Sequence, residues 1–292
     1  MRRQGEEATT HDQRQRRQEG TSTRRSDAVT HKPLRAVLFD WGDTLIRPPG
    51  ITTDNAGHLA RVEAFFHDSL QPALQRTGRA TASSWPAFRE VYEEAAMAQV
   101  RSTLDTGREH SLATRIERAL DGSNAGLDAA DYQALGEALG HSIARGCTPM
   151  PGARALLERL HGRIRVGLLS NYPHAATVRD SLDDASLLQY LDVVVISAET
   201  GWSKPHRPAF EAAIDALGTD PETVLFVGDD LDNDMRGAKS MAMRTAWLPR
   251  ADERGHDAAA HDFVDHRLDR LDDLDPILAP ALAGQTSRDP QQ

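Results

Sequence analysis

Polar side chains of complementary chemistry follow four short apolar segments of the chain. In chain order they are Asp40, Ser170-Asn171, Lys204 and Asp229-Asp230. Each could be structural when taken alone, because carboxylates and hydroxyls also cap helices and turns. Their occurrence after successive apolar segments favours a functional site instead, since ligands of parallel sheets bind beyond the carboxyl ends of the strands.

A pair of carboxylates at one sheet edge needs a positive charge. At about 4 Å and an effective dielectric constant near ~20, Asp40 and Asp229 would repel by roughly 4 kcal/mol unless a cation lies between them or one is protonated. Mg²⁺ prefers such oxygen ligands. Lys204 adds a positive charge, and Ser170 and Asn171 add neutral donors, so the group can surround the oxygens of a phosphoryl group. These residue types predict phosphoryl transfer with Mg²⁺ as cofactor.

Five continuous apolar runs are expected to be the strands that hold these residues. They cover residues 36–39, 166–169, 193–196, 224–227 and 245–248. Continuous apolar runs are typical of strands that are buried on both faces. Helical stretches separate the later strands and begin near Gly152, Pro173, Pro208 and Asn233. This alternation predicts an α/β fold with a parallel sheet and helices on both faces.

Residues 48–147 interrupt the alternation with purely helical periodicity. One apolar stripe is made of Leu59, Val62, Phe66, Leu70 and Leu74. A second stripe follows Ser84, which is a typical helix cap. The predicted organisation is a disordered tail at 1–33, an α/β core at 34–47 and 148–280, an all-helical insertion at 48–147 and a second disordered tail at 281–292.

The composition limits the partners and the compartment. A formal net charge of −10 over 292 residues argues against nucleic acid, because its phosphate backbone requires a basic surface. No apolar run approaches the roughly 18 residues of a membrane span, so no membrane segment is predicted. The single cysteine, Cys147, cannot form an intramolecular disulfide and fits a cytoplasmic location. A small anionic substrate is still compatible with this composition if positive charge is local.

Four ordered motifs contain the candidate residues. They are Phe39-Asp40-Trp41-Gly42-Asp43-Thr44-Leu45, Leu169-Ser170-Asn171, Ser203-Lys204-Pro205 and Val227-Gly228-Asp229-Asp230-Leu231-Asp232-Asn233-Asp234. From about residue 34 to residue 250 the chain resembles hydrolases of the haloacid dehalogenase superfamily. The resemblance implies a Rossmann-like core, a helical cap inserted after the first motif, Mg²⁺ as cofactor and an aspartyl-phosphate intermediate.

The same resemblance assigns a role to each site residue. Asp40 is the nucleophile and Lys204 and Ser170 hold the transferred group. Further contacts to the substrate are expected from Asn171 and Thr44. The expected metal ligands are Asp40, Asp229, the backbone carbonyl of Gly42 and, at or beside the metal, Asp234.

The first motif departs from the usual phosphatase pattern at Gly42. In the family, a second aspartate two residues after the nucleophile protonates the leaving group, and here Asp43 stands one residue later. General acid catalysis typically contributes about 10²- to 10⁴-fold. Either Asp43, or a residue of the insertion such as His58 or Glu63, supplies the proton, or the natural substrate has a good leaving group.

Three other functions are weighed against a phosphatase. Phosphonate hydrolysis in this family uses a cap lysine, and none of the three lysines lies in residues 48–147. Haloacid dehalogenation needs no metal, whereas Asp229 and Asp234 suit one. A catalytically weak binding or regulatory module would explain Gly42, but not the nucleophile, the lysine and the acidic pair. The sequence therefore favours a Mg²⁺-dependent phosphatase of a small phosphorylated metabolite, without identifying the substrate or the oligomeric state.

Overall fold

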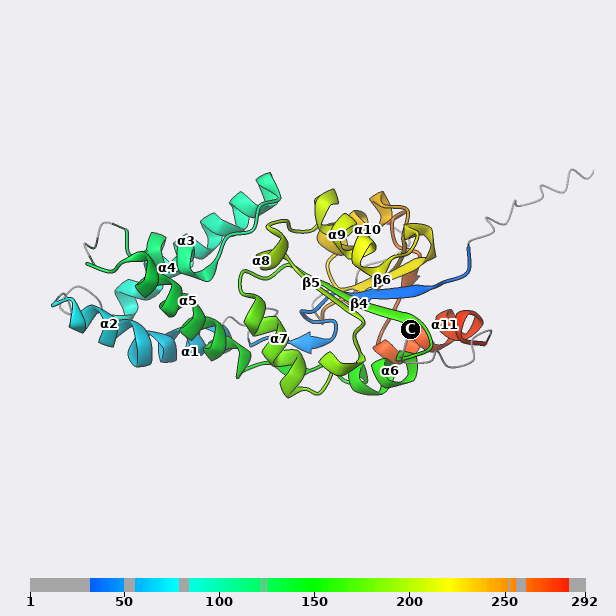
Figure 1. Cartoon of the computed structure of the whole chain (residues 1–292), viewed down its shortest axis with the longest axis horizontal. Coiled ribbons are helices and arrows are strands. Elements are labelled where there is room, and N and C mark those ends of the chain that lie inside the picture. Colours follow the sequence, from blue (N-terminus) through cyan, green and yellow to red (C-terminus); the bar gives the residue numbers. More distant parts are fainter. Residues whose placement is uncertain are drawn as a thin grey trace, which may run out of the picture. The chain divides into compact units, whose positions relative to one another are not determined.

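A six-stranded parallel sheet is the central element of the computed structural model (Figure 1). The strand order is β5-β4-β1-β6-β7-β8, and each neighbouring pair is parallel. The strands are β1 (Ala36–Phe39), β4 (Arg165–Ser170), β5 (Val193–Ile196), β6 (Val224–Gly228), β7 (Arg244–Trp247) and β8 (His266–Arg267). The five predicted strands are confirmed. The sequence analysis missed β8, because two residues are too few to form an apolar run.

The structure describes residues 32–49, 56–78, 84–121, 123, 125–251, 253–255 and 261–283. These residues belong to one compact unit. The predicted tails lie outside the described residues, except for residues 32–33 and 281–283. Residues 281–283 end α11 (Leu274–Ala283), so the prediction of a disordered tail is wrong for these three residues. No helix in this described part is both long and apolar enough to cross a membrane.

Alternate residues of β1 face opposite sides of the sheet. Val37 and Phe39 belong to one apolar cluster, and Ala36 and Leu38 belong to another. The first cluster includes side chains of α6 (Ala153–Leu160), α7 (Ala175–Asp184) and α11, and the second includes those of α9 (Arg207–Leu217) and α10 (Gly237–Ser240). Helices therefore cover both faces of the sheet, as predicted (Figure 1).

The central position of β1 brings several strand ends together. Phe39 lies opposite Leu168 of β4 and Val227 of β6. Because these strands run in the same direction, the residues that follow them lie at one edge of the sheet. Asp40 and Asp229 are thus neighbours in space despite their distance in sequence.

Most of the residues described between β2 (Ile46–Arg47) and β3 (Thr148–Pro149) are helical. These two short strands pair antiparallel, so the chain leaves and re-enters the core side by side. The helical elements described between them are α1 (Ala56–Phe65), the π-helical turn η1 (Phe66–Leu70), α2 (Gln71–Arg76), α3 (Trp85–Thr106), α4 (Leu112–Ala119) and α5 (Ala129–Ala144). Ser84 is the N-cap of α3, as predicted, although its side chain makes no capping hydrogen bond.

The helical segment joins the core at α5 and α7. Thr177 Oγ1 donates a 2.9 Å hydrogen bond to the carbonyl of Gly140, and His174 Nε2 lies 2.7 Å from Glu137 Oε2. A Cβ atom at Gly140 would lie 2.1 Å from His174 Nδ1, a distance that no side chain permits. Glycine at this position therefore allows the two helices to approach closely.

Candidate active site

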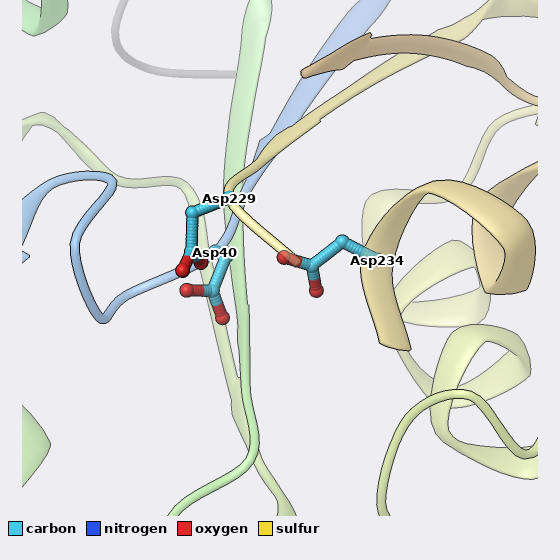
Figure 2. Close-up of side chains that lie close together, drawn as sticks. All are labelled: Asp40, Asp229 and Asp234. Carbon is cyan, nitrogen blue, oxygen red and sulfur yellow. The ribbon is translucent and has the colours of Figure 1, made fainter. Parts of the chain in front are cut away.

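Three buried aspartates meet at the carboxyl edge of the sheet (Figure 2). Asp40 directly follows β1, Asp229 directly follows β6, and Asp234 belongs to η5 (Leu231–Arg236), a π-helical turn. One carboxylate oxygen of each lies within 4.8 Å of those of the other two. Figure 2 shows Asp40 and Asp229 close together and the Asp234 carboxylate turned toward them. The structure thus brings together three of the predicted metal ligands.

The loop after β6 places Asp234 against the strand end. Asp230 caps η5, because its Oδ1 accepts hydrogen bonds from the backbone N–H groups of Asp232 and Asn233 at 2.9 and 2.8 Å. Asp234 then turns back, and its Oδ2 accepts a hydrogen bond from Asp230 N at 3.2 Å. A Cβ atom at Gly228 would lie 2.3 Å from this same Oδ2. Only glycine at this position leaves room for the carboxylate.

Lys204 is the cation of this cluster and is itself buried. Its Nζ donates hydrogen bonds to Asp40 Oδ1 at 2.5 Å and to Asp234 Oδ1 at 2.7 Å. Asn171 holds its backbone, donating from Nδ2 to the Lys204 carbonyl at 2.8 Å and accepting from Lys204 N at 2.7 Å. The amide expected to contact the substrate therefore also positions the lysine.

The helical segment supports the loop that carries Lys204. Ser203 N donates a 2.9 Å hydrogen bond to the carbonyl of Gly107, which lies just after α3. Glu109 Oε2 accepts hydrogen bonds from Ser197 Oγ at 2.6 Å and Ser203 Oγ at 3.1 Å. Movement of this part of the insertion would therefore disturb the lysine loop.

Burial and mutual repulsion alter the proton affinities of the cluster. Burial, together with the charges of Asp40 and Asp234, raises the pKa of Asp229 well above its usual value. Burial also raises the pKa of Asp234 to about 7, although Lys204 opposes this change. Burial alone would lower the pKa of Lys204, because it disfavours the charged form. The attraction of the Asp234 and Asp40 carboxylates outweighs this effect, so the pKa of Lys204 is raised. A divalent cation would relieve the repulsion among the carboxylates.

The donor set fits a hard divalent cation. Asp40, Asp229 and Asp234 offer only oxygen atoms, and Mg²⁺ takes oxygen ligands, including carboxylates. Three carboxylates against the two cations that contact them, Lys204 and Arg250, leave one excess negative charge for a metal ion to neutralise. These three residues could therefore hold Mg²⁺.

A cavity of about 360 Å³ opens onto the cluster. The predicted site residues that line it are Asp40, Gly42, Asp43, Ser170, Asn171, Lys204, Asp229 and Asp234. Ser170 Oγ is buried and has no hydrogen-bond partner among the described residues, so it is available to a ligand in the cavity. Thr44 Oγ1 is also buried without a hydrogen-bond partner among the described residues, but Thr44 does not line this cavity, so its contact with the substrate stays a prediction.

The geometry of the first motif clarifies its departure from the family pattern. Asp43 adopts a left-handed backbone conformation with a φ of 51°, which asparagine and aspartate tolerate better than most residues. Its side chain is buried and lies 4.0 Å from Arg47 Nε. A Cβ atom at Gly42 would lie 3.8 Å or more from any neighbour. Position 42 therefore has space for a side chain, and Asp43 remains at the cavity wall.

The residues proposed from the insertion as proton donors do not line the cavity. His58 stacks over Tyr92 at a ring distance of 6.3 Å. Burial, with a smaller effect of Arg115, lowers the pKa of His58 to about 4. His58 is therefore uncharged at neutral pH and is not an imidazolium acid, and Glu63 is also absent from the cavity lining.

The sequence analysis missed Arg250 and the apolar wall of the cavity. Arg250 Nη1 donates a 2.9 Å hydrogen bond to Asp229 Oδ2. Val100 of α3 lines the cavity, as do Trp41 and Tyr172, whose rings pack edge to face at 4.9 Å. Arg250 could have been found from the sequence, because it is a cation that lies shortly after the end of β7. Val100 gave no signal, because the orientation of α3 depends on tertiary packing.

Comparisons with known proteins identify the family of this chain. A family model of haloacid dehalogenase-like hydrolases matches residues 34–241. The chain is 26% identical over 251 residues to ribulose-1,5-bisphosphate 5-phosphatase from Halopiger xanaduensis, covering 84% of this chain and 99% of that protein. It is 30% identical over 220 residues to phosphoserine phosphatase from Thermus thermophilus, covering 74% and 82%. The match to pyrimidine 5'-nucleotidase YjjG of Escherichia coli, at 36% identity over 115 residues, covers 39% of this chain and only about half of that relative, 51%.

Solved structures show the same fold. A HAD phosphatase from Thermococcus onnurineus superimposes with a TM-score of 0.58 at 24% identity, covering 84% of this chain and 98% of that one. A 2-haloacid dehalogenase from Pseudomonas syringae gives a TM-score of 0.61 at 22% identity, covering 85% and 99%. At these identities the structures establish the fold but do not distinguish a phosphatase from a dehalogenase. Taken with the matched family model, the motifs and the fold place this chain in the haloacid dehalogenase-like hydrolase family.

Proposed function

We propose that the protein is a Mg²⁺-dependent phosphatase that hydrolyses a small phosphorylated metabolite through an aspartyl-phosphate on Asp40. The buried group of Asp40, Asp229, Asp234 and Lys204 is the observation that carries this proposal. A pure binding protein has no chemical reason to bury three carboxyl groups around one ammonium group. The names of the three relatives, all phosphatases or nucleotidases, support the same reaction.

Asp40 is the proposed nucleophile. Its contact with Lys204 Nζ orients the carboxylate. A carboxylate oxygen forms a bond to phosphorus while the bond between phosphorus and the leaving oxygen breaks. A water molecule then attacks the aspartyl-phosphate, which releases phosphate and restores the carboxylate.

The phosphoryl oxygens require donors throughout both steps. Lys204 supplies a buried positive charge, and Ser170 Oγ is a neutral donor without a protein partner among the described residues. Asn171 keeps Lys204 in position through its two backbone hydrogen bonds. Mg²⁺, held by Asp40, Asp229 and Asp234 with the Gly42 carbonyl, would stabilise negative charge on the phosphoryl oxygens.

Protonation of the leaving group is assigned to Asp43. It lines the cavity wall, whereas His58 and Glu63 do not. The alternative is a substrate whose leaving group needs little protonation. The apolar wall of Val100, Trp41 and Tyr172 suits an aryl group in that case.

We further propose that residues 48–147 act as a cap domain above a core made of residues 34–47 and 148–280. The contact of Ser203 with Gly107 and the position of Val100 in the cavity support this role. Specificity would then arise from cap side chains at the cavity. A cytoplasmic location is also proposed, because the single cysteine of the chain, Cys147, is a free thiol, as is typical of a reducing compartment.

A catalytically weak binding or regulatory module is the competing function. Gly42 favours it, because the usual acid is missing. Dehalogenation is disfavoured, since it does not use the metal that Asp229 and Asp234 could hold.

Turnover of p-nitrophenyl phosphate tests the proposal. Wild-type protein is expected to release nitrophenol with Mg²⁺ and not with EDTA. Asp40→Asn should lower turnover by at least about 10³-fold, because it removes the nucleophile. Asp232→Asn is the matched control, since Asp232 is 76% exposed and pairs only with Arg236 among the described residues. A panel of phosphometabolites then seeks the substrate, and no Asp40-dependent turnover on any of them would favour the binding module.

A further inference from the structure

A second cavity of about 390 Å³ lies next to the active-site cavity. Its charged lining residues are Arg47, Arg250, Arg254, Arg270, Asp43 and Asp269. Four arginines against two aspartates give the lining an excess of two positive charges, the opposite of the aspartate cluster. Arginine is well suited to bind phosphate groups, because its planar guanidinium donates paired hydrogen bonds.

Two of the four arginines are largely uncommitted. Arg254 has no ion-pair partner in the described part of the chain, and the only partner of Arg47 there, Asp43, lies at 4.0 Å. Asp269 is already paired, because Arg267 Nη1 donates to its Oδ1 at 2.6 Å. The positive charge of Arg47 and Arg254 is therefore available to an anion.

The other two arginines have nearby carboxylates. Arg250 contacts Asp229 at 2.9 Å and Glu253 at 3.2 Å, and Arg270 lies 3.5 Å from Asp273. Bidentate donors can share their charge between a carboxylate and a further anion. Arg250 and Arg270 therefore add positive charge to the cavity, but Arg47 and Arg254 are the main candidates to bind an anion.

The two cavities share two wall residues, Asp43 and Arg250. A ligand in the arginine-lined cavity would therefore lie beside the first-motif loop, on the other side of these residues from the aspartates. The cavity also touches both short strands that connect the insertion, through Arg47 of β2 and Met150 after β3. Binding there can affect both the active site and the insertion.

We propose that the arginine-lined cavity is a second phosphate-binding site, distinct from the position of the phosphoryl group on Asp40. The phosphate is either a second phosphate of the substrate or a free inorganic phosphate ion. The binding itself does not depend on the proposed phosphatase activity.

Phosphate titration of metal-free protein isolates this site. In EDTA the active-site cavity is lined by five aspartates against Lys204 and Arg250, so it should repel phosphate. Calorimetry with inorganic phosphate is expected to give one site. Arg254→Gln and Arg47→Gln should each weaken binding by roughly tenfold, because each removes one charge-assisted hydrogen bond. Arg76→Gln is the control, since Arg76 is 67% exposed on α2 and lines neither cavity.

Three results would overturn the proposal. They are the absence of phosphate binding to metal-free wild-type protein, undiminished binding to the Arg47→Gln/Arg254→Gln double variant, and an equal loss of binding in Arg76→Gln. Thermal unfolding of each variant checks that it is folded. None of these outcomes depends on turnover, so the site and the phosphatase proposal can fail separately.

Two kinetic arms with Mg²⁺ distinguish the sources of the phosphate. If the substrate supplies it, Arg254→Gln should raise KM about tenfold for propane-1,3-diyl bisphosphate and leave KM for propyl phosphate unchanged. If a free ion binds, millimolar phosphate should change kcat for propyl phosphate in wild type, and Arg254→Gln should remove this change. Competitive inhibition that is equal in both proteins would assign the kinetic effect to the active site alone.

Discussion

The two neighbouring cavities are lined by side chains of opposite charge, and these side chains differ in how deeply they are buried. The active-site cavity contains carboxylates fixed at strand ends, and Asp234 and Lys204 are 1% and 3% exposed. The arginine-lined cavity uses side chains from loops and strand ends, and the Arg47 side chain is 57% exposed. Charges that are buried by the fold have altered pKa values, whereas exposed guanidinium groups are screened by water and salt. Substitutions in the first cavity should therefore have large effects, and those in the second should have small ones.

Lys204→Met is expected to have the largest effect. It leaves Asp40 and Asp234 buried without their cation, and removal of one partner from a buried ion pair typically costs about 3–5 kcal/mol. Chemical denaturation in metal-free buffer should show a loss of this order. Turnover of p-nitrophenyl phosphate should fall by at least about 10³-fold, because a charge that stabilises the transition state is lost.

A double variant separates the two effects of Lys204. Lys204→Met/Asp234→Asn removes one of the stranded carboxylates, so part of the lost stability should return while turnover stays low. If stability is unchanged by the second substitution, the carboxylates were already protonated in Lys204→Met.

The leaving-group acid gives the next largest effect. Asparagine tolerates the left-handed conformation of Asp43 as well as aspartate does, so Asp43→Asn should leave the backbone of the loop unchanged. Turnover of an alkyl phosphate should fall by about 10²-fold, while turnover of p-nitrophenyl phosphate should change little, because its leaving group needs no proton.

Gly42→Asp tests the same role by gain of function. A Cβ atom at this position meets no close neighbour, so the carboxyl group should be accommodated beside the cavity. In the Asp43→Asn background it is expected to restore roughly tenfold of the alkyl phosphate turnover. Equal rates of wild type and Asp43→Asn on both substrates would exclude Asp43 as the acid.

The contrast between the two cavities also explains what the sequence could predict. Strand β1 was identifiable because its four residues are buried on both faces, and Asp40 and Asp229 were identifiable because they follow aligned parallel strands. The role of Asn171 as the support of Lys204 was not, since it depends on a contact between residues 33 positions apart. The arginine-lined cavity was also missed, because its residues come from four separate loops and strand ends with no motif in common.

Magnesium affinity should depend on pH through the buried carboxyl groups. Burial raises the pKa of Asp229 well above its usual value and that of Asp234 to about 7, so the metal-free protein holds protons that Mg²⁺ must displace. The Mg²⁺ dissociation constant is expected to fall by about tenfold between pH 6 and pH 7.5. Calorimetry at a series of pH values measures this change, and Asp234→Asn should flatten it.

The raised pKa values of Asp229 and Asp234 also predict how the stability of the metal-free protein changes with pH. A carboxyl group with a raised folded-state pKa binds more protons in the folded than in the unfolded chain. The metal-free protein should therefore lose stability as the pH rises from about 4 to 7, and Mg²⁺ should restore it. Carboxyl groups with a lowered pKa, such as Asp265, act in the opposite direction, so the test is the comparison with metal-free Asp234→Asn. The same pH profile in both proteins would contradict the raised pKa of Asp234.

Arg250 belongs to both cavities, and its replacement should have the smallest effect. Arg250→Gln removes a cation 2.9 Å from Asp229 Oδ2 that competes with Mg²⁺. At pH 8.5 Mg²⁺ should bind a few-fold more tightly, since nearby like charges repel. At pH 6 the gain should disappear, because Arg250 lowers the pKa of Asp229 and its loss favours the proton over the metal.

In metal-free protein Arg250→Gln should weaken phosphate binding a few-fold. The control, Arg250→Lys, should behave like wild type in the Mg²⁺ titrations. Weaker Mg²⁺ binding by Arg250→Gln at high pH would instead mean that Arg250 mainly holds Asp229 in position.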